Sequence, residues 1–229
     1  MRIVTFLLTF ILFIFVGGSV CATHYSSSRI KHYATNTPRA VENNLYNLTK
    51  YLVEPLDDDY DKAKMIAFWI ASHINYDEYL YNDGATTKLI KTHKTQSSDE
   101  LLESRVGICG EFATLFNDMC RIAGIRSRII TGYAYPSRLR LRNKERKNAA
   151  HAWNYFLYKG KRIYVDTTFM AKGKTSPRRR ATEVSHKRAL RKVQHDNEDK
   201  SQINDFNDFY FDFSYKDEMK KSHYIHEEQ

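Results

Sequence analysis

The order of its hydrophobic periods is the feature that most constrains how this chain can fold. Helical spacing of apolar residues comes first, and strand-like alternation follows it. The helical segments are 38–54, 60–74 and 111–124, and the strand segments are 125–135, 149–158, 162–169 and an aromatic run at 206–213. The polar stretch 76–99 is expected to be a loop. Helices followed by strands predict an α+β domain.

The first 22 residues have the pattern of a secretory signal peptide. Arg2 precedes an apolar run over residues 3–16, and small residues then lead to Ala22. The run is too short to span a bilayer comfortably. We expect cleavage after Ala22, a secreted or periplasmic protein, and no stable membrane span after cleavage. The alternatives are an uncleaved N-terminal anchor and a lipoprotein acylated on Cys21.

The cysteines exclude a fold held together by disulfides. The chain has three of them, and cleavage of the signal peptide would leave Cys109 and Cys120. Both fall within one predicted helix, where they are too far apart along the axis to bridge. The fold therefore depends on a hydrophobic core, and a free thiol in an oxidising compartment calls for a functional explanation. The apolar neighbours of Cys120 indicate that it is a core residue.

The rest of the chain is expected to be one domain with two basic insertions. A polar, flexible lead-in at 23–37 precedes a domain over 38–229, with insertions near 136–148 and 171–203. These insertions carry much of the positive charge behind the net charge of +9. Solvated loops are the simpler interpretation, and an anionic surface or polymer is the partner that they would fit. Nucleic acid is not expected, because neither basic run interleaves aromatic side chains.

Cys109 lies where a glycine-bracketed loop enters a predicted helix. Backbone N–H groups at a helix start lack internal partners, and the helix dipole adds partial positive charge there. Both favour a thiolate over a thiol. Gly107 and Gly110 would leave room for a substrate chain beside the sulfur. The alternative is a small buried residue with no chemistry, so the assignment needs a base nearby.

His151 and Asp166 are the candidates for that base and its partner. A two-residue turn at 159–160 would pair Tyr158 with Lys161. Counting back along both strands, Asp166 then lies on the same face as His151, one diagonal step away. A carboxylate there would fix the imidazole tautomer and stabilise the imidazolium. A turn one residue longer would place the two side chains on opposite faces. A purely structural histidine and aspartate are the alternative.

Several segments resemble the transglutaminase-like superfamily. They are Arg105-Val-Gly-Ile-Cys-Gly-Glu-Phe-Ala113, Cys120-Arg-Ile-Ala-Gly-Ile125, Thr131-Gly-Tyr-Ala134, Ala150-His-Ala-Trp-Asn154 and Val165-Asp-Thr-Thr-Phe169. Upstream, Phe68-Trp-Ile70 through Ile74-Asn-Tyr-Asp77 resembles the segment that precedes the domain in bacterial members and in the kyphoscoliosis-peptidase branch. The resemblance covers roughly Asp61 to Phe169, with a weaker echo from Phe209 to Tyr224. Phe169 departs from the pattern, since many members have Trp there.

The resemblance implies that Cys109 is the nucleophile, His151 the base and later the acid, and Asp166 the residue that orients the imidazole. It implies a papain-like fold, in which N-terminal helices and the Cys-bearing helix pack on an antiparallel sheet. The implied chemistry is acyl transfer on amide bonds of protein or peptide substrates. The acyl group would pass to water in a peptidase or amidase, or to an amine in a protein-glutamine transferase.

Two other interpretations remain open. A catalytically silent binding or scaffold protein could keep the fold and dock on an anionic surface. A zinc site could be drawn from Cys109, His151 and either His73 or His93. No ligand pair among these has the short spacing typical of zinc sites, so we expect no metal. The resemblance implies no cofactor.

Overall fold

A computed structural model describes residues 25–77, 95–134, 149–171, 206–213 and 223–228. The predicted signal peptide, nearly all of both basic insertions and His93 lie outside these residues, and the domain boundaries stay a prediction. Among the helices that the structure describes, none is long and apolar enough to cross a bilayer. The elements are α1 (Ser27–Thr35), η1 (Arg39–Val41), α2 (Leu45–Val53), α3 (Asp59–His73), β1 (Asn75–Tyr76), α6 (Ser98–Ser104), β2 (Val106–Gly107), α7 (Cys109–Ile122), β3 (Ser127–Ala134), β4 (Ala149–Tyr158), β5 (Lys161–Val165), α8 (Thr167–Met170), η3 (Asp208–Tyr210) and β6 (His223–Glu228).

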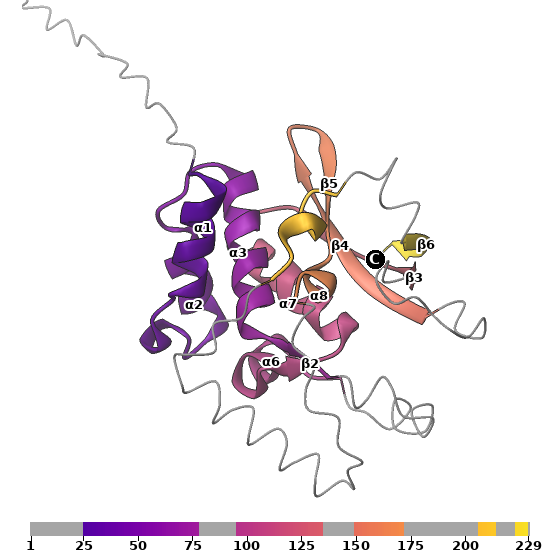
Figure 1. Ribbon diagram of the computed structural model, residues 1–229, viewed down its shortest axis with the longest axis horizontal. Coiled ribbons are helices and arrows are strands. Elements are labelled where there is room, and N and C mark those ends of the chain that lie inside the picture. The colour runs from indigo at the N-terminus through magenta and orange to yellow at the C-terminus, as the bar shows by residue number, and fades with distance from the viewer. Residues whose placement is uncertain (1–24, 78–94, 135–148, 172–205, 214–222, 229) are drawn as a thin grey trace, which may run out of the picture.

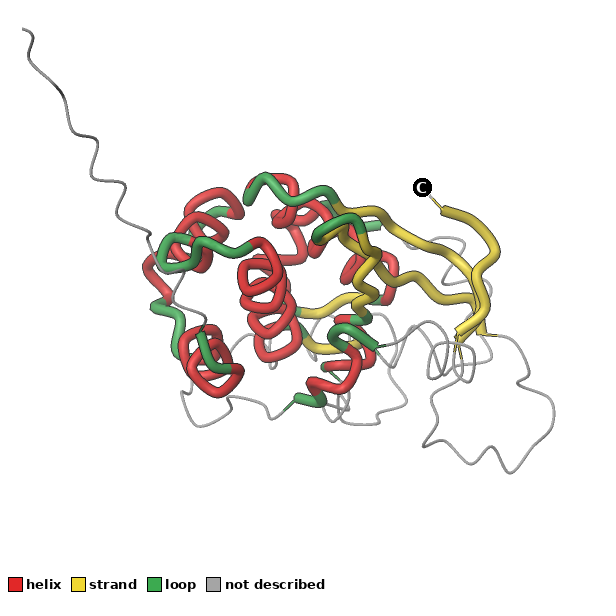
Figure 2. The backbone as a smooth tube through the Cα atoms, turned by 90° about the horizontal axis from the view of Figure 1, so that it is seen from above, coloured by secondary structure: helices red, strands yellow, loops and turns green. Residues whose placement is uncertain are grey.

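The N-terminal helices and the four-stranded sheet occupy opposite sides of the molecule. The main sheet has the order β5-β4-β3-β6, and all its pairings are antiparallel. Helices α1, α2 and α3 lie on the far side of α7 from this sheet (Figure 1). Figure 2 shows the same separation from above, with the helices in red and the strands in yellow. The predicted α+β, papain-like arrangement, with the Cys-bearing helix packed on an antiparallel sheet, is confirmed.

The core is built around α3. Asp58 caps its start by accepting a hydrogen bond from the Tyr60 N–H at 2.8 Å. The helix packs against α1, α2, α7 and α8, so it is buried on nearly every side. Its fully buried side chains include Met65, Ile66, Phe68, Trp69 and Ile70. Such a helix gives the sheet side of the molecule a rigid support.

The N-terminal part of the domain differs from expectation in two places. The predicted flexible lead-in, 23–37, contains α1, because Ile30 and Ala34 are one turn apart and both are fully buried in the core. Most of the predicted loop, 76–99, lies outside the described residues, and its last two positions already belong to α6, whose start is a capping box formed by Ser97 and Glu100. Both helices are short and mostly polar, so their hydrophobic period is weak.

The predicted hairpin register is confirmed at the turn. Lys159 and Gly160 both have positive φ, 47° and 76°, as a two-residue type I′ turn requires. Tyr158 pairs with Lys161 as expected. The second strand is shorter than predicted, since β5 ends at Val165.

The predicted aromatic strand at 206–213 is wrong. Its middle forms η3, and Phe211 makes one isolated bridge to Val165. The segment covers part of the core with aromatic rings. Phe206 and Phe211 pack against Phe68 at ring-centroid distances of 4.7 and 6.2 Å. Ring packing rather than strand pairing therefore explains its composition.

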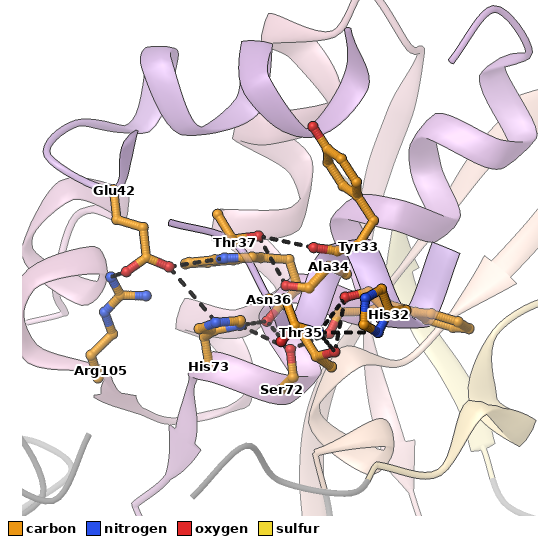
Figure 3. A network of polar contacts seen from close by, with 12 residues as sticks. His32, Tyr33, Ala34, Thr35, Asn36, Thr37, Glu42, Ser72, His73 and Arg105 are labelled. Atoms are coloured by element: carbon orange, nitrogen blue, oxygen red, sulfur yellow. Dashed lines mark hydrogen bonds and ion pairs between the residues drawn. The ribbon is translucent and has the colours of Figure 1, made fainter. Parts of the chain in front are cut away.

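A buried ion pair ties the loop before Cys109 to the helical side. The Glu42 carboxylate contacts Arg105 Nη2 at 2.9 Å, Trp69 Nε1 at 3.2 Å and His73 Nε2 at 3.7 Å (Figure 3). Arg105 ends α6 in the left-handed conformation, with φ of 59°. Its carbonyl accepts the N–H of Asn75 at 2.8 Å, which joins β1 to the strand that leads into Cys109. The chain entering the candidate site is thus held from both sides.

Candidate active site

Cys109 is the first residue of α7, as predicted, and its side chain is half-buried. The buried Glu111 organises this start, because its carboxylate accepts the N–H of Ile108 at 2.9 Å and that of Gln96 at 2.8 Å. On the sheet side, Asn154 of β4 donates to the Ala113 carbonyl of α7 at 3.0 Å. The helix start is therefore fixed both to the preceding loop and to the strand that carries His151.

Gly107 has a packing role rather than the predicted role in substrate access. A Cβ at this position would lie 2.6 Å from Leu101 Cδ1 and 2.8 Å from Glu111 Oε2. At Gly110, by contrast, an added Cβ meets nothing within 4 Å. The first glycine therefore allows the close approach of α6 and Glu111 that orders the start of α7.

The structure brings His151 and Asp166 together. His151 on β4 and Asp166 just after β5 are both buried, and His151 Nε2 lies 2.8 Å from Asp166 Oδ2. Asp166 is also the N-cap of α8, since its Oδ1 accepts the Phe169 N–H at 2.9 Å. The end of β5 and the start of α8 thus fix the carboxylate where the hairpin register predicted it.

Cys109 completes the arrangement. The His151 side chain and the backbone N–H of Ala152 are close enough to its thiol to lower the pKa of Cys109. Since His151 Nε2 faces Asp166, Nδ1 is the ring nitrogen left for the thiol. All three predicted site residues therefore lie in one series, from α7 through β4 to the start of α8.

Charges within this series oppose the effect of burial. Burial alone would raise the pKa of the Cys109 thiol, but hydrogen bonding and charge from His151 and the Ala152 N–H lower it below its ordinary value. Burial would lower the pKa of His151, but the negative charge and hydrogen bond of Asp166 raise it to about 10. Both shifts favour a thiolate beside an imidazolium at neutral pH.

Aromatic rings cover the imidazole. The His151 ring stacks on Phe169 at a centroid distance of 4.8 Å and on Trp153 at 5.8 Å. Phe169, where the resemblance leads one to expect Trp, still presents a flat face to the imidazole. These rings restrict the orientation of His151 and exclude water from its contact with Asp166.

A second histidine, His223, also reaches Asp166. Its Nε2 lies 2.9 Å from the same Oδ2, and its side chain is fully buried. Sequence reasoning missed this residue. It follows Asp166 by 57 positions, across the second basic insertion, and no local spacing relates the two. Only the pairing of β6 with β3 places it there.

Among the described residues, one group has the composition of a metal site. His151, Asp166 and His223 have ligand atoms within 4.8 Å of one another. Both imidazoles are engaged with the Asp166 carboxylate. The zinc grouping with His73 does not form, because His73 lies on α3 beside Trp69 and Glu42. The structure therefore presents a hydrogen-bonded cluster at Asp166.

A half-buried cysteine at a helix start, beside a histidine and an aspartate that are hydrogen-bonded to each other on an antiparallel sheet, defines a papain-like fold with a thiol site. The sequence profile of the transglutaminase-like superfamily matches residues 46–167, more than half of the chain. The chain therefore belongs to the transglutaminase-like superfamily.

Individual relatives are distant. The mouse kyphoscoliosis peptidase is 26% identical over 129 residues, which are 56% of this chain and 18% of that protein. The human kyphoscoliosis peptidase is 26% identical over 125 residues, 55% of this chain and 18% of that protein. The chain thus spans less than a fifth of the length of these relatives. A solved structure from Cytophaga hutchinsonii, provisionally assigned as a cysteine protease, is 23% identical, with a TM-score of 0.41 over 59% of this chain and 40% of its own.

The two glycines beside Cys109 give a matched test of the helix start. We expect Gly107→Ala to lower the free energy of unfolding by about 2 kcal/mol, because its Cβ overlaps Leu101 and Glu111. Gly110→Ala should cause no loss, since the space is open and Ala favours a helix. Urea denaturation of both variants checks this. Equal midpoints for the two would contradict the packing role of Gly107.

Proposed function

We propose that this protein is a thiol-dependent acyl-transfer enzyme that acts on amide bonds of proteins or peptides. Cys109 is the nucleophile, His151 the general base and then the general acid, and Asp166 the residue that orients His151. The observation that carries the proposal is the buried hydrogen bond between His151 and Asp166 next to Cys109, whose thiol pKa His151 lowers. Membership in the superfamily supports the same chemistry.

In the first half-reaction, the Cys109 thiolate attacks the amide carbonyl carbon. A C–S bond forms, and the carbonyl electron pair moves to oxygen. The backbone N–H of Cys109, at the positive end of α7, donates to this oxyanion. When the tetrahedral intermediate collapses, the C–N bond breaks and the amine leaves with the proton of His151. A thioester on Cys109 remains.

In the second half-reaction, water or an amine attacks the thioester carbonyl. His151 accepts a proton from the attacking group, the C–S bond breaks, and Cys109 leaves as a thiolate. Asp166 stabilises the imidazolium in each half-reaction and stays ionised, without taking up a proton itself. Burial of Asp166 and stacking of Phe169 on His151 keep that contact free of water.

Alkylation of Cys109 tests the activated thiol directly, and Cys120 is its internal control. The lowered pKa of Cys109 means that its thiolate persists to lower pH than that of an ordinary thiol, and it is lost as the pH falls through that lowered value. Burial raises the pKa of Cys120, which has no exposed surface. We therefore expect iodoacetamide to label Cys109 below about pH 7, while Cys120 stays unlabelled in the folded protein.

The same experiment with His151→Ala removes the base. Labelling of Cys109 should then be slower and should rise only near the ordinary thiol pKa of about 8.5. Mass spectrometry of the tryptic peptides separates the two cysteines. If the wild-type Cys109 reacted no faster than an ordinary thiol at neutral pH, the proposed nucleophile would be wrong.

Hydrolysis is the favoured outcome of the second half-reaction. No feature recognised in the sequence keeps water away from a thioester, and the curated relatives are called peptidases. A peptide library incubated with and without a primary amine separates the two outcomes. We expect cleaved or deamidated peptides in both reactions, at rates that Cys109→Ala lowers by at least about a thousandfold. Amine-dependent products at the expense of hydrolysis would assign a transferase instead.

Export is the last part of the proposal. The charged start, the short apolar run and the small residues before Ala22 support cleavage and secretion. Protein recovered from the exported fraction should then begin at Thr23 when its N-terminus is sequenced. A membrane-bound chain that keeps residues 1–22 would support the uncleaved anchor.

A further inference from the structure

We infer that His223 is a positioning residue for this reaction: it holds the Asp166 carboxylate in the orientation in which Asp166 supports His151. The inference rests on the proposed function and adds a fourth side chain to the set. It follows from the contacts of one carboxylate with two imidazoles and one helix start.

The Asp166 carboxylate is held by three donors. Oδ2 is shared by His151 Nε2 at 2.8 Å and His223 Nε2 at 2.9 Å. Oδ1 accepts the Phe169 N–H at 2.9 Å. The single Phe169 bond to Oδ1 only partly restrains rotation about the Cβ–Cγ bond, and that rotation moves both oxygens. The His223 donor on Oδ2 opposes this rotation, so that Oδ2 stays within hydrogen-bond distance of His151 Nε2.

His223 has the protonation state that this role needs. Burial lowers its pKa, the Asp166 carboxylate opposes that shift, and the positive charge of His151 adds to it. His223 is therefore a neutral imidazole that donates its Nε2–H, while His151 carries the positive charge. Asp166 and His151 are the titratable groups that face it among the described residues. The single negative charge of Asp166 is thus left to balance the imidazolium of His151.

The surroundings of His223 are rigid. Its ring lies among the rings of Trp153, Phe169 and Phe213, at centroid distances of 4.8, 5.1 and 5.1 Å. Its backbone starts β6, where it pairs with Ala134 of β3. Contacts from β4, α8 and β3 therefore hold this imidazole in place. A buried histidine kept only for packing would not need to direct its N–H at the oxygen that already receives His151.

Substitutions that keep or remove the donor test the inference. Gln can place an N–H near the position of Nε2, whereas Phe fills the space without a donor, and Asn is too short to reach the carboxylate. Phe213→Leu is the packing control, because it alters a ring that touches His223 and leaves the hydrogen bond intact. For each variant we would measure the pH profile of Cys109 alkylation by iodoacetamide and the urea midpoint.

We expect His223→Phe to lower the alkylation rate of Cys109 at about pH 6 by about tenfold or more, and to move the profile to higher pH. His223→Gln should stay close to wild type. Phe213→Leu should lower the urea midpoint without moving the profile. If His223→Phe does not fold, His223→Asn against His223→Gln decides the question, and the Asn variant should show the shift.

Three outcomes would overturn this account, and they differ in what fails. If wild-type Cys109 reacts as an ordinary thiol, the proposed function itself fails. If wild-type Cys109 is activated and the Phe and Asn variants that fold keep the wild-type profile, His223 is a packing residue and the inference alone fails. A shift in Phe213→Leu as large as that in His223→Phe would also overturn it, because packing would then explain the effect.

Discussion

The buried carboxylate of Asp166 is the interaction on which the rest of the site depends. It accepts hydrogen bonds from His151, from His223 and from the start of α8, so it joins β4, β6 and the end of β5. Burial alone would raise its pKa, but these partners hold the pKa far below the ordinary value, and the group is a carboxylate. An ionised group in the core is costly unless it is fully paired. The sheet must therefore assemble in one register for the site to be stable.

The helical side supplies the other half of the chemistry. Its large core, built around α3, supports α7, and Glu111 and Gly107 fix the point where α7 begins. Cys109 and His151 lie on a helix and a strand that pack directly against each other, because Asn154 hydrogen-bonds α7 to the strand that carries the histidine. A site built on a helix start and a strand keeps its geometry better than one built on loops. The fold thus brings a helix dipole and a buried negative charge to opposite ends of one imidazole.

The sequence predicts those features whose causes are local. Cys109 at a helix start and the turn at Lys159 and Gly160 follow from glycine positions and hydrophobic periods, and together they place His151 near Asp166. Helix α1 was missed because its two core contacts, Ile30 and Ala34, lie in an otherwise polar segment. His223 could not be predicted, since its contact with Asp166 depends on a strand pairing across 57 positions. Long-range pairing, rather than residue type, limits what the sequence reveals about this site.

The protonation state of His151 tests the central claim most directly. The claim is that the buried Asp166 carboxylate keeps this imidazole charged beside the Cys109 sulfur. Nitrogen-15 NMR of the imidazole, followed across pH, reports that charge without any substrate. Since the pKa of His151 is raised to about 10, the account predicts a charged ring at neutral pH that loses its proton only in the alkaline range, and an earlier loss in Asp166→Asn. A ring that titrates near the ordinary value of about 6.5 in the wild-type protein would contradict it.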